Sequence, residues 1–466
     1  MVRTTQRSVL MENRLAVILA AGKGTRMKSK LYKVLHPVCG LSMVEHVVNS
    51  VKSSGVDEIV TIVGHGAETV KEVLGEQSKY ALQEEQLGTG HAVLQAKDLI
   101  GDLDGQTLVI CGDTPLLSSD TLNYLFKYHS ENQASATILT AIAEDPTGYG
   151  RVVRSTSEDV EKIVEQKDAS ESELTISEIN TGTYVFDNKA LFKALANVKN
   201  DNAQGEYYLP DVIELIKAEG GKISAYIMDD MSEALGVNDR VALSQANELM
   251  TKRINLEHMR NGVTIVNPAT TFIEASVKIG NDTIIEPGVI LKGNTIIGSD
   301  CLIGANSEIV DSEIADNVEI TQSVIEKSVV AEGVTIGPFA HLRPNSKLDK
   351  NVHIGNYVEV KNSTIGEGTK AGHLTYIGDA DLEENINVGC GTIFVNYDGK
   401  HKHRSHVGKD AFIGCNANIV SPVNIGEKVF VAAGTTVIKD VESESLVISR
   451  SEQKNIPGYW EKLQKK

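Results

Sequence analysis

The chain has 466 residues, about three times the ~150 residues of a typical domain, so we expect more than one core. Hydrophobic residues make up 41% of it, which excludes an intrinsically disordered chain. A net charge of −18 argues against a general binder of nucleic acids or anionic membranes, and it leaves small phosphorylated ligands open.

The chain is rich in glycine and poor in aromatic rings, with 40 Gly, 8 Phe, 13 Tyr and 1 Trp, so we expect an aliphatic core and frequent turns. Its 5 cysteines form no C-x-x-C pair, so we expect no disulfide framework or structural zinc, and a cytoplasmic location. No apolar run approaches the ~18 residues of a membrane span. Residues 1–14 are polar, and we expect a disordered leader or an expression remnant there.

Residues 15–238 alternate strand-like and helix-like segments. Strands are expected over 15–20, 58–63 and 108–111, and helices over 43–52 and 66–74. Buried strands separated by helices predict a mostly parallel α/β sheet, in which ligands bind beyond the carboxyl ends of the strands. The glycine-rich turn at Gly22–Gly24 and Asp113 both fall at such ends.

Residues 239–260 predict a connecting helix. The stretch from Asp239 to Met259 contains no Gly or Pro, and Leu243, Ala246, Met250 and Ile254 recur at steps of three or four residues. A helix of this length would be a rod of about 30 Å.

A repeat fills residues 261–450, before a tail over 451–466. Aliphatic-Gly pairs recur mostly at multiples of six, as at Ile279-Gly280, Ile297-Gly298 and Ile303-Gly304. This spacing indicates a hexapeptide β-helix, in which each six-residue face supplies one inward aliphatic side chain. The 33-residue step from Ile303 to Ile336 is not a multiple of six, so one face there should carry an irregular turn. The repeat lapses between Gly389 and Gly408, where a loop is expected.

Four motifs carry a family resemblance: LAAGKGTRM, QLGTGHA, NDNAQGEYYLPD and KAGHLTYIGDA. Together they resemble the bacterial bifunctional N-acetylglucosamine-1-phosphate uridyltransferase/glucosamine-1-phosphate acetyltransferase family, from about Leu15 to Arg450. The resemblance implies a Rossmann-like nucleotidyltransferase domain, a linker helix and a left-handed parallel β-helix that forms a homotrimer. It implies acetyl transfer from acetyl-CoA to glucosamine-1-phosphate, then uridylyl transfer from UTP to N-acetylglucosamine-1-phosphate, supplying cell-wall precursors.

The resemblance also assigns residues to the uridyltransferase site. The turn around Gly22-Lys23-Gly24 is neither a Walker loop nor a dinucleotide fingerprint, but backbone N–H groups of such a turn can approach phosphates. Asp113 and Asn238 match the family's Mg²⁺ ligands. The matching substrate-binding residues are Leu19, Ala20, Ala21, Gly22, Lys23, Arg26 and Lys33 on the phosphate side, Gln83, Gly88 and Thr89 at the uracil, and Gly150, Glu165 and Asn180 at the sugar. Asn238 also belongs to the substrate-binding set.

In the β-helix, His373 matches the family's general base, and an imidazole that titrates near neutral pH suits that role. Glu359 is expected to orient the base or the sugar, and Lys402 lies in a basic loop expected to reach another subunit's substrate or the coenzyme phosphates. The matching sugar-phosphate residues are Arg343, Lys361, Tyr376, Asn387, Asn396 and Tyr397, and the acetyl-CoA residues are Cys390, Cys415, Ala433 and Arg450.

Other interpretations stay open at this point. Cys390 could be a reactive thiol, but no basic neighbour in sequence favours its thiolate, so we expect a backbone role. His401, His403 and His406 could hold a metal, but no Cys or carboxylate stands at ligand spacing. The whole chain could instead be a single-activity sugar-nucleotide pyrophosphorylase whose β-helix serves trimerisation or regulation, or an inactive scaffold.

Overall fold

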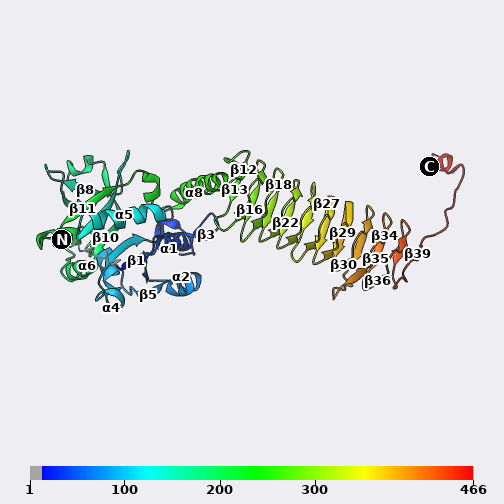
Figure 1. Ribbon diagram of the computed structural model, residues 1–466, viewed down its shortest axis with the longest axis horizontal. Helices are drawn as coiled ribbons and strands as arrows, with labels where there is room; N and C mark the ends of the chain where they lie inside the picture. Colours follow the sequence, from blue (N-terminus) through cyan, green and yellow to red (C-terminus); the bar gives the residue numbers. More distant parts are fainter. Residues whose placement is uncertain (1–12, 465–466) are drawn as a thin grey trace, which may run out of the picture. The chain divides into compact units, whose positions relative to one another are not determined.

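The computed structural model describes residues 13–464, which form two compact units with their boundary between Met250 and Thr251 (Figure 1). Residues 1–12 of the expected leader lie outside the described residues. Arg14, the last residue of that predicted segment, belongs to β1 (Arg14–Ala20). Its guanidinium donates to the Ser54 carbonyl at 2.6 Å and lies over the Phe126 ring, so the strand start is anchored.

The first unit is built on a twisted sheet with strand order β11-β7-β10-β6-β1-β4-β5. The segment from β6 to β5 is parallel, as predicted, but β10 runs antiparallel to both β6 and β7, and the hairpin of β8 and β9 extends from it. The strand bounds are β4 (Glu58–Val63), β5 (Lys79–Leu82), β6 (Gln106–Cys111), β7 (Ala136–Ile142), β8 (Gly150–Arg154), β9 (Val160–Val164), β10 (Glu178–Asp187) and β11 (Ile223–Ile227).

Helices cover both faces of this sheet. Alternate residues of β1 enter different cores, with Val17 on one face and Ile18 on the other, and both are fully buried. Helix α1 begins with a capping box, in which Ser42 and Glu45 each bond the other's backbone N–H. The helix bounds are α1 (Met43–Ser53), α2 (Ala67–Leu74), α3 (Thr89–Leu94), α4 (Lys97–Ile100), α5 (Ser119–Glu131), α6 (Asn188–Leu195) and α7 (Asp211–Ala218).

Helix α8 covers Arg240–Arg260, and the boundary between the two units falls within it. Three of the four side chains in the predicted apolar stripe, Ala246, Met250 and Ile254, are buried, whereas Leu243 is only half-buried. No helix in residues 13–464 combines the length and the apolar composition needed to cross a lipid bilayer.

The second unit is a parallel β-helix of short strands, from β12 (Thr264–Ile265) to β39 (Leu446–Val447). Each face contributes one inward aliphatic side chain, such as Ile303, Ile336 and Ile354, and these pack in a ring-poor interior. Strands of successive coils pair in parallel, as Ile336 of β24 (Thr335–Ile336) does with Ile354 of β27 (His353–Lys361). The hexapeptide β-helix predicted from the repeat is therefore confirmed.

Several faces have five residues instead of six. Between Ile303 and Ile336 there are three such faces, not one, and each turns at a non-glycine residue with positive φ: Asp311 (46°), Gln322 (39°) and Lys327 (43°). Further along the β-helix, Asn362 (46°) and Asp379 (50°) mark two more. The left-handed conformation closes the corner with one residue fewer, so the inward aliphatic side chains stay stacked.

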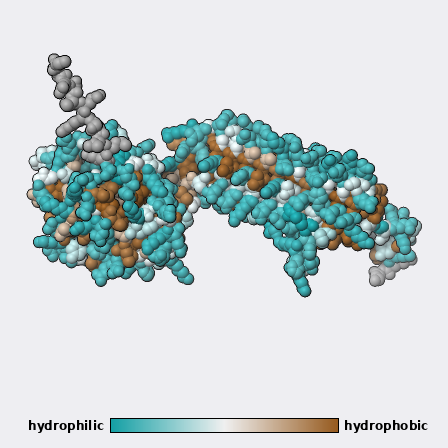
Figure 2. Space-filling view, turned by 60° about the horizontal axis from the view of Figure 1, so that its bottom comes forward, coloured by the Kyte–Doolittle hydropathy of each residue, from teal (hydrophilic) through white to brown (hydrophobic). Residues whose placement is uncertain are grey.

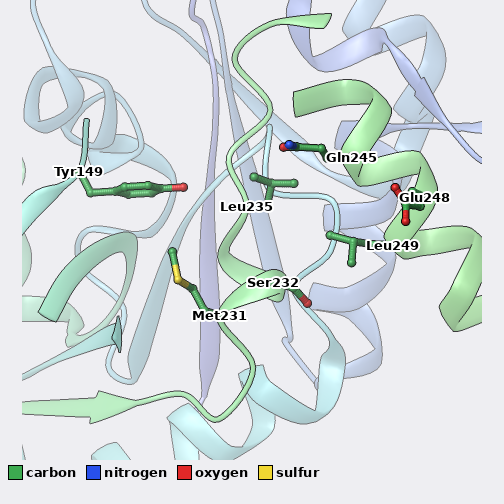
Figure 3. A pocket seen from close by; sticks show the side chains of 7 residues that line it. All are labelled: Tyr149, Met231, Ser232, Leu235, Gln245, Glu248 and Leu249. Carbon is green, nitrogen blue, oxygen red and sulfur yellow. The ribbon is translucent and has the colours of Figure 1, made fainter. Parts of the chain in front are cut away.

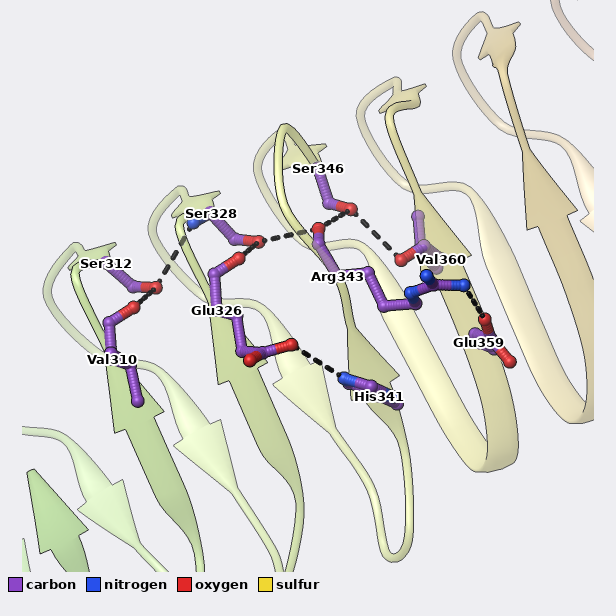
Figure 4. A network of polar contacts seen from close by, with 9 residues as sticks. All are labelled: Val310, Ser312, Glu326, Ser328, His341, Arg343, Ser346, Glu359 and Val360. Carbon is purple, nitrogen blue, oxygen red and sulfur yellow. Dashed lines mark hydrogen bonds and ion pairs between the residues drawn. The ribbon is translucent and has the colours of Figure 1, made fainter. Parts of the chain in front are cut away.

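Hydrogen-bonded serines tie successive coils together at one corner (Figure 4). The Ser328 backbone N–H donates to Ser312 Oγ at 3.1 Å, and Ser328 Oγ donates to the Arg343 carbonyl at 3.3 Å. One coil further, Ser346 Oγ donates to the Val360 carbonyl at 3.1 Å. These small hydroxyl groups satisfy buried backbone atoms and fix the strand that carries Arg343.

The two residues of β17 (Ile296–Ile297) point to opposite sides of the strand, so truncating each of them to Ala should destabilise the fold to a different extent. Ile297 is 2% exposed and Ile296 is 45% exposed. We expect Ile297→Ala to cost about 2–5 kcal/mol of stability, because it leaves a cavity in the prism, and Ile296→Ala to cost clearly less. Denaturant unfolding of the two variants beside the unchanged chain measures this, and equal losses would contradict the assigned facing.

A half-buried carboxyl, that of Asp211, predicts a pH-dependent stability. Burial, together with repulsion from Glu214 and Asp168, raises the pKa of Asp211 to about 6. The folded state therefore holds this proton more tightly than the unfolded state, and that stabilisation is lost as the pH rises from about 4 to about 6. We expect Asp211→Asn to raise the melting temperature at pH 7 but not at pH 4. The exposed Glu171→Gln is the control, and an equal shift at both pH values would refute the effect.

Candidate active sites

The glycine-rich turn that follows β1 packs against the segment that contains Lys33. Gly24 adopts φ 60°, and a Cβ there would lie 2.5 Å from Lys33 Cβ, so this position requires glycine. The close approach brings Lys33 to the carboxyl end of the central strand. Gly22 has open space around its missing side chain, so a ligand can approach the backbone there.

Four of the predicted residues meet in one polar cluster. The Lys33 ammonium ion-pairs with the Asp113 carboxylate and donates to Asn238 Oδ1 at 3.0 Å. Arg26 donates to the same Asn238 oxygen at 2.8 Å. The side chains of Lys33 and Asp113 are only 16% and 14% exposed, so their charges interact with little solvent screening.

This cluster fits a magnesium ion by its donor chemistry. A carboxylate oxygen of Asp113 and the amide oxygen of Asn238 both face the same cationic group, the Lys33 ammonium. Hard oxygen donors in this number are what Mg²⁺ takes from a protein when substrate phosphates and water complete its shell.

The residues predicted for the uracil follow β5. Gln83 is buried, and its amide Nε2 donates to the Gly88 carbonyl at 3.1 Å. Gly88 has φ 112°, and a Cβ there would lie 2.5 Å from the Tyr207 carbonyl oxygen. Thr89 accepts from the Leu209 backbone N–H at 3.0 Å. The QLGTGHA and EYYLPD motifs, far apart in sequence, therefore form one wall.

The residues predicted for the sugar also lie together. Gly150 of β8 pairs with Asn180 of β10, and a Cβ on Gly150 would lie 3.2 Å from Glu165 Oε1. Asn180 donates from Nδ2 to the Tyr184 hydroxyl at 2.7 Å. Burial, with repulsion from Asp168 and Asp211, raises the pKa of Glu165. Gly150, Glu165 and Asn180 therefore lie side by side and place polar groups together at this end of the sheet.

Two features of this unit were not predicted from the sequence. Arg151 is 2% exposed and donates to Gln166 Oε1 at 2.9 Å, so it ties β8 to the loop after β9. A pocket of about 320 Å³ lies beside Tyr149, whose ring points toward Leu235 (Figure 3). Its lining residues are Tyr149, Met231, Ser232, Leu235, Gln245, Glu248 and Leu249, none of which is a predicted site residue.

In the second unit, the predicted residues gather on β27 and β29 (Lys370–Gly378). His373 is exposed and lies in register with Asn356 of the preceding coil. Tyr376 lies in register with Glu359, whose Oε1 accepts from Arg343 at 2.8 Å (Figure 4). The ion pair with Glu359 raises the pKa of Arg343.

Cations crowd the place where a sugar phosphate is expected. Hydrogen bonding to Lys402, followed by burial and repulsion from Lys402 and Arg343, lowers the pKa of Lys361. Lys402 comes from the loop between β32 (Ile393–Val395) and β33 (Ser405–Val407), where the repeat lapses. Neighbouring like charges destabilise one another, so an anion bound among them would relieve the repulsion.

Asp379 is a candidate site residue that was not predicted from the sequence, although it stands in the KAGHLTYIGDA motif. It is 7% exposed and accepts from the amides of Asn362 and Asn396 at 2.5 Å each. Asn396 also donates to the Tyr376 hydroxyl at 3.3 Å. Asp379 therefore fixes Asn396 against Tyr376, and only the folded corner shows it.

The residues predicted for acetyl-CoA form a column along one corner. Val388 pairs with Ile413 and Ile413 with Val431, so the residues two places on, Cys390, Cys415 and Ala433, occupy equivalent positions in three coils. Arg450 donates to the Ala433 carbonyl at 3.2 Å. Asn387, in β31 (Asn387–Val388), is exposed beside this column.

The loop histidines have separate partners. His403 contacts Asp398 at 2.7 Å and His406 contacts Glu383 at 3.3 Å. Within residues 13–464, no group of three or more His, Cys, Asp or Glu side chains is arranged to hold a metal. Tyr397, 57% exposed, bridges to Lys402 across the same loop.

Exposed apolar side chains gather on the β-helix (Figure 2). Phe339, Tyr357 and Leu374 are 45%, 57% and 60% exposed, and the first two rings stack at 5.3 Å. All three have positive φ, at 58°, 55° and 31°, which bulky residues rarely adopt. Leu374 directly follows His373, so this apolar corner borders the predicted base.

Comparison with known proteins assigns both units. Residues 15–239 match the Nucleotidyl transferase family, 269–365 the GMPPB C-terminal domain and 406–439 the hexapeptide repeat of succinyl-transferase. The chain is 63% identical over 453 residues to the bifunctional protein GlmU of Enterococcus faecalis, covering 97% of this chain and 99% of that protein. It is 58% identical to GlmU of Listeria welshimeri, with the same two coverages, and 59% identical to GlmU of Latilactobacillus sakei, with 97% and 98% covered.

These identities extend over almost the whole chain, and they include both the nucleotidyltransferase region and the hexapeptide repeats. They confirm the resemblance that the four sequence motifs indicated. The chain therefore belongs to the GlmU family of bifunctional uridyltransferases and acetyltransferases that serve UDP-N-acetylglucosamine biosynthesis.

Proposed function

We propose that the chain acetylates glucosamine-1-phosphate with acetyl-CoA in its β-helix and then joins N-acetylglucosamine-1-phosphate to UTP in its nucleotidyltransferase unit. The second step releases pyrophosphate and yields UDP-N-acetylglucosamine, a cell-wall precursor. One observation carries the proposal. Two separate charged centres stand in different units, each beside the groups that its reaction needs: the Lys33–Asp113 ion pair with Arg26 in the first unit, and Arg343 with Lys361 in the second.

Uridylyl transfer needs positioning and charge neutralisation rather than a nucleophilic side chain. The sugar phosphate attacks the α-phosphorus of UTP, and pyrophosphate leaves from the opposite side. Lys23, Arg26 and Lys33 neutralise the triphosphate, with the backbone of Leu19–Gly22 against it. Asp113 and Asn238 would hold Mg²⁺, which supplies further positive charge to the phosphates.

The remaining residues of that unit select the two substrates. Gln83 offers both a donor and an acceptor to the uracil, while Gly88 and Thr89 form the adjoining wall. Gly150 leaves room beside Glu165, and Asn180 supplies an amide to the sugar. The Glu165 side chain is half-buried, and its oxygens can accept hydrogen bonds from sugar hydroxyl groups.

Acetyl transfer needs a base and a phosphate clamp. His373 takes the proton from the 2-amino group of glucosamine-1-phosphate as the nitrogen attacks the thioester carbonyl, and the coenzyme thiol leaves. Arg343 and Lys361 hold the phosphate, with Lys402 beside them. Tyr376, Asn387, Asn396 and Tyr397 contact the sugar, and the column of Cys390, Cys415 and Ala433 with Arg450 follows the coenzyme.

A homotrimer is the assembly that we propose for the β-helix. The exposed corner of Phe339, Tyr357 and Leu374 supports it, because strained apolar residues beside a site are retained where another surface covers them. The Lys402 loop extends from its own coil and would reach a neighbouring copy. The five unbridged cysteines favour a cytoplasmic location.

A single-activity pyrophosphorylase is the second candidate. A β-helix that served only trimerisation or regulation would not need Arg343, Lys361 and His373 close together. The presence of this group therefore favours the bifunctional enzyme over the single-activity one. Supplying glucosamine-1-phosphate, acetyl-CoA, UTP and Mg²⁺ and following free thiol and pyrophosphate separately decides it. We expect both products, whereas pyrophosphate that appears only with N-acetylated sugar phosphate would favour the single activity.

Removal of the proposed metal ligand should affect one activity only. We expect Asp113→Ala to lower uridylyl transfer by at least about 100-fold, because the triphosphate loses its bound ion, and to leave acetyl transfer unchanged. Pyrophosphate release with Mg²⁺ and coenzyme thiol release measure the two reactions. Uridylyl transfer at the unchanged rate would remove Asp113 from the site.

Removal of the proposed base should have the reverse effect. We expect His373→Ala to lower acetyl transfer by at least about 100-fold while uridylyl transfer persists, since general-base catalysis contributes about 10²–10⁴-fold. The matched control is His406→Ala, another partly exposed histidine of the β-helix, which is paired with Glu383. If both variants kept full acetyl transfer, another group would have to be the base.

A further inference from the structure

Cys390 and Cys415 lie in register on adjacent coils. Val388 pairs with Ile413 just before them, and Ile393 pairs with Asn418 just after them. The Asn416 backbone N–H donates to the Cys390 carbonyl at 2.8 Å, which holds the two corners together. A Cβ on Gly389 would lie 2.6 Å from the Cys415 nitrogen, so the coils are in close contact on this side.

This spacing suits a disulfide. Paired strands lie about 4.8 Å apart, and bridged cysteines have Cα atoms about 4.4–6.8 Å apart. Both thiols are accessible, since Cys415 is exposed and Cys390 is partly exposed. The other cysteines differ: Cys39 and Cys301 are buried, and burial raises the pKa of Cys111 to about 12.

His373 lies on the other side of Cys390. Ala371 pairs with Val388, and Tyr376 pairs with Ile393, so His373 occupies the same corner position one coil earlier. An imidazole in that position can accept the thiol proton when the sulfur attacks. The sequence showed no base near Cys390, because the two residues meet only through the coil register.

We propose that Cys390 and Cys415 form a reversible modification site for low-molecular-weight disulfides, and that its oxidation stops acetyl transfer. The inference rests on the proposed function, because it places both thiols in the acetyl-CoA column. Coenzyme A disulfide, supplied as a separate oxidant, is the fitting one, because it carries the coenzyme groups for which this column is proposed. A bridge would hold both side chains across the corner on which the thioester is expected.

The exchange balances in two steps. The Cys390 thiol gives its proton to His373, and the thiolate attacks one sulfur of the small disulfide, releasing the first small thiol. Cys415 then loses its proton and attacks the Cys390 sulfur, and the second small thiol leaves as the intrachain S–S bond forms. Two protein thiols are oxidised and one small disulfide is reduced to two thiols.

The test treats the full-length, reduced protein with coenzyme A disulfide, followed by alkylation, peptide mapping and both activity assays. We expect a Cys390–Cys415 disulfide, a loss of acetyl transfer of at least about tenfold that dithiothreitol reverses, and unchanged uridylyl transfer. Each chain should release two coenzyme thiols. Retention of a coenzyme adduct on both cysteines, or two thiols that remain open to alkylation, would overturn the site.

Variants separate the steps. Cys415→Ser should release one coenzyme thiol and keep an adduct on Cys390, while Cys301→Ala should form the disulfide like the unchanged chain. His373→Ala should form it at least about fivefold more slowly at neutral pH, and an equal rate would remove the histidine from the exchange.

The two proposals fail in different ways. Absence of acetyl transfer in the fully reduced protein would refute the proposed function, while the peptide map would still decide whether the bridge forms. A bridge that forms and leaves acetyl transfer unchanged would refute the inhibitory role.

Discussion

The narrow aliphatic interior of the β-helix is the constraint on which the second unit depends. Each coil must place one aliphatic side chain per face inside, so strands of successive coils pair at equivalent residues. Corners that lose a residue compensate with a left-handed residue such as Lys327 or Asp379, and the stacking continues. The same register brings His373, Cys390 and Cys415 into one column. Core packing therefore determines which polar residues become neighbours.

The first unit reaches a comparable result by a different route. Loops that follow parallel strands end at one edge of the sheet, and there Lys33 and Asp113 neutralise each other in a poorly solvated place. A carboxylate and an ammonium in direct contact nearly balance each other's charge. In the proposed reaction, a triphosphate with its counter-ion would replace this ion pair by new ones among charges that are already in place.

The sequence predicted the fold well, because hexapeptide spacing and strand–helix alternation are local patterns. Strand ends, which are readable from buried runs, pointed to the Gly22–Gly24 turn and Asp113, whereas Lys33, Arg26 and Asn238 were selected through the family resemblance. The sequence did not reveal Asp379, which matters because the side-chain amides of two other turns, those of Asn362 and Asn396, donate hydrogen bonds to it. It also did not reveal that β10 runs antiparallel to its neighbour β6. The neighbours of Cys390 were missed for the same reason: they depend on exact coil lengths, including the faces shortened by one residue.

Coil-on-coil stacking also gives the β-helix a direction of fraying. Each coil is held mainly by the coils next to it, so such arrays behave almost as one-dimensional chains that open from their ends. Strand β39 closes the stack, and Arg450 follows it directly. Thermal opening that begins there would release the Arg450–Ala433 contact well before it reached the coil of His373. The corner of Ala433 and Arg450, at the end of the stack, is therefore the part of the β-helix that we expect to open first.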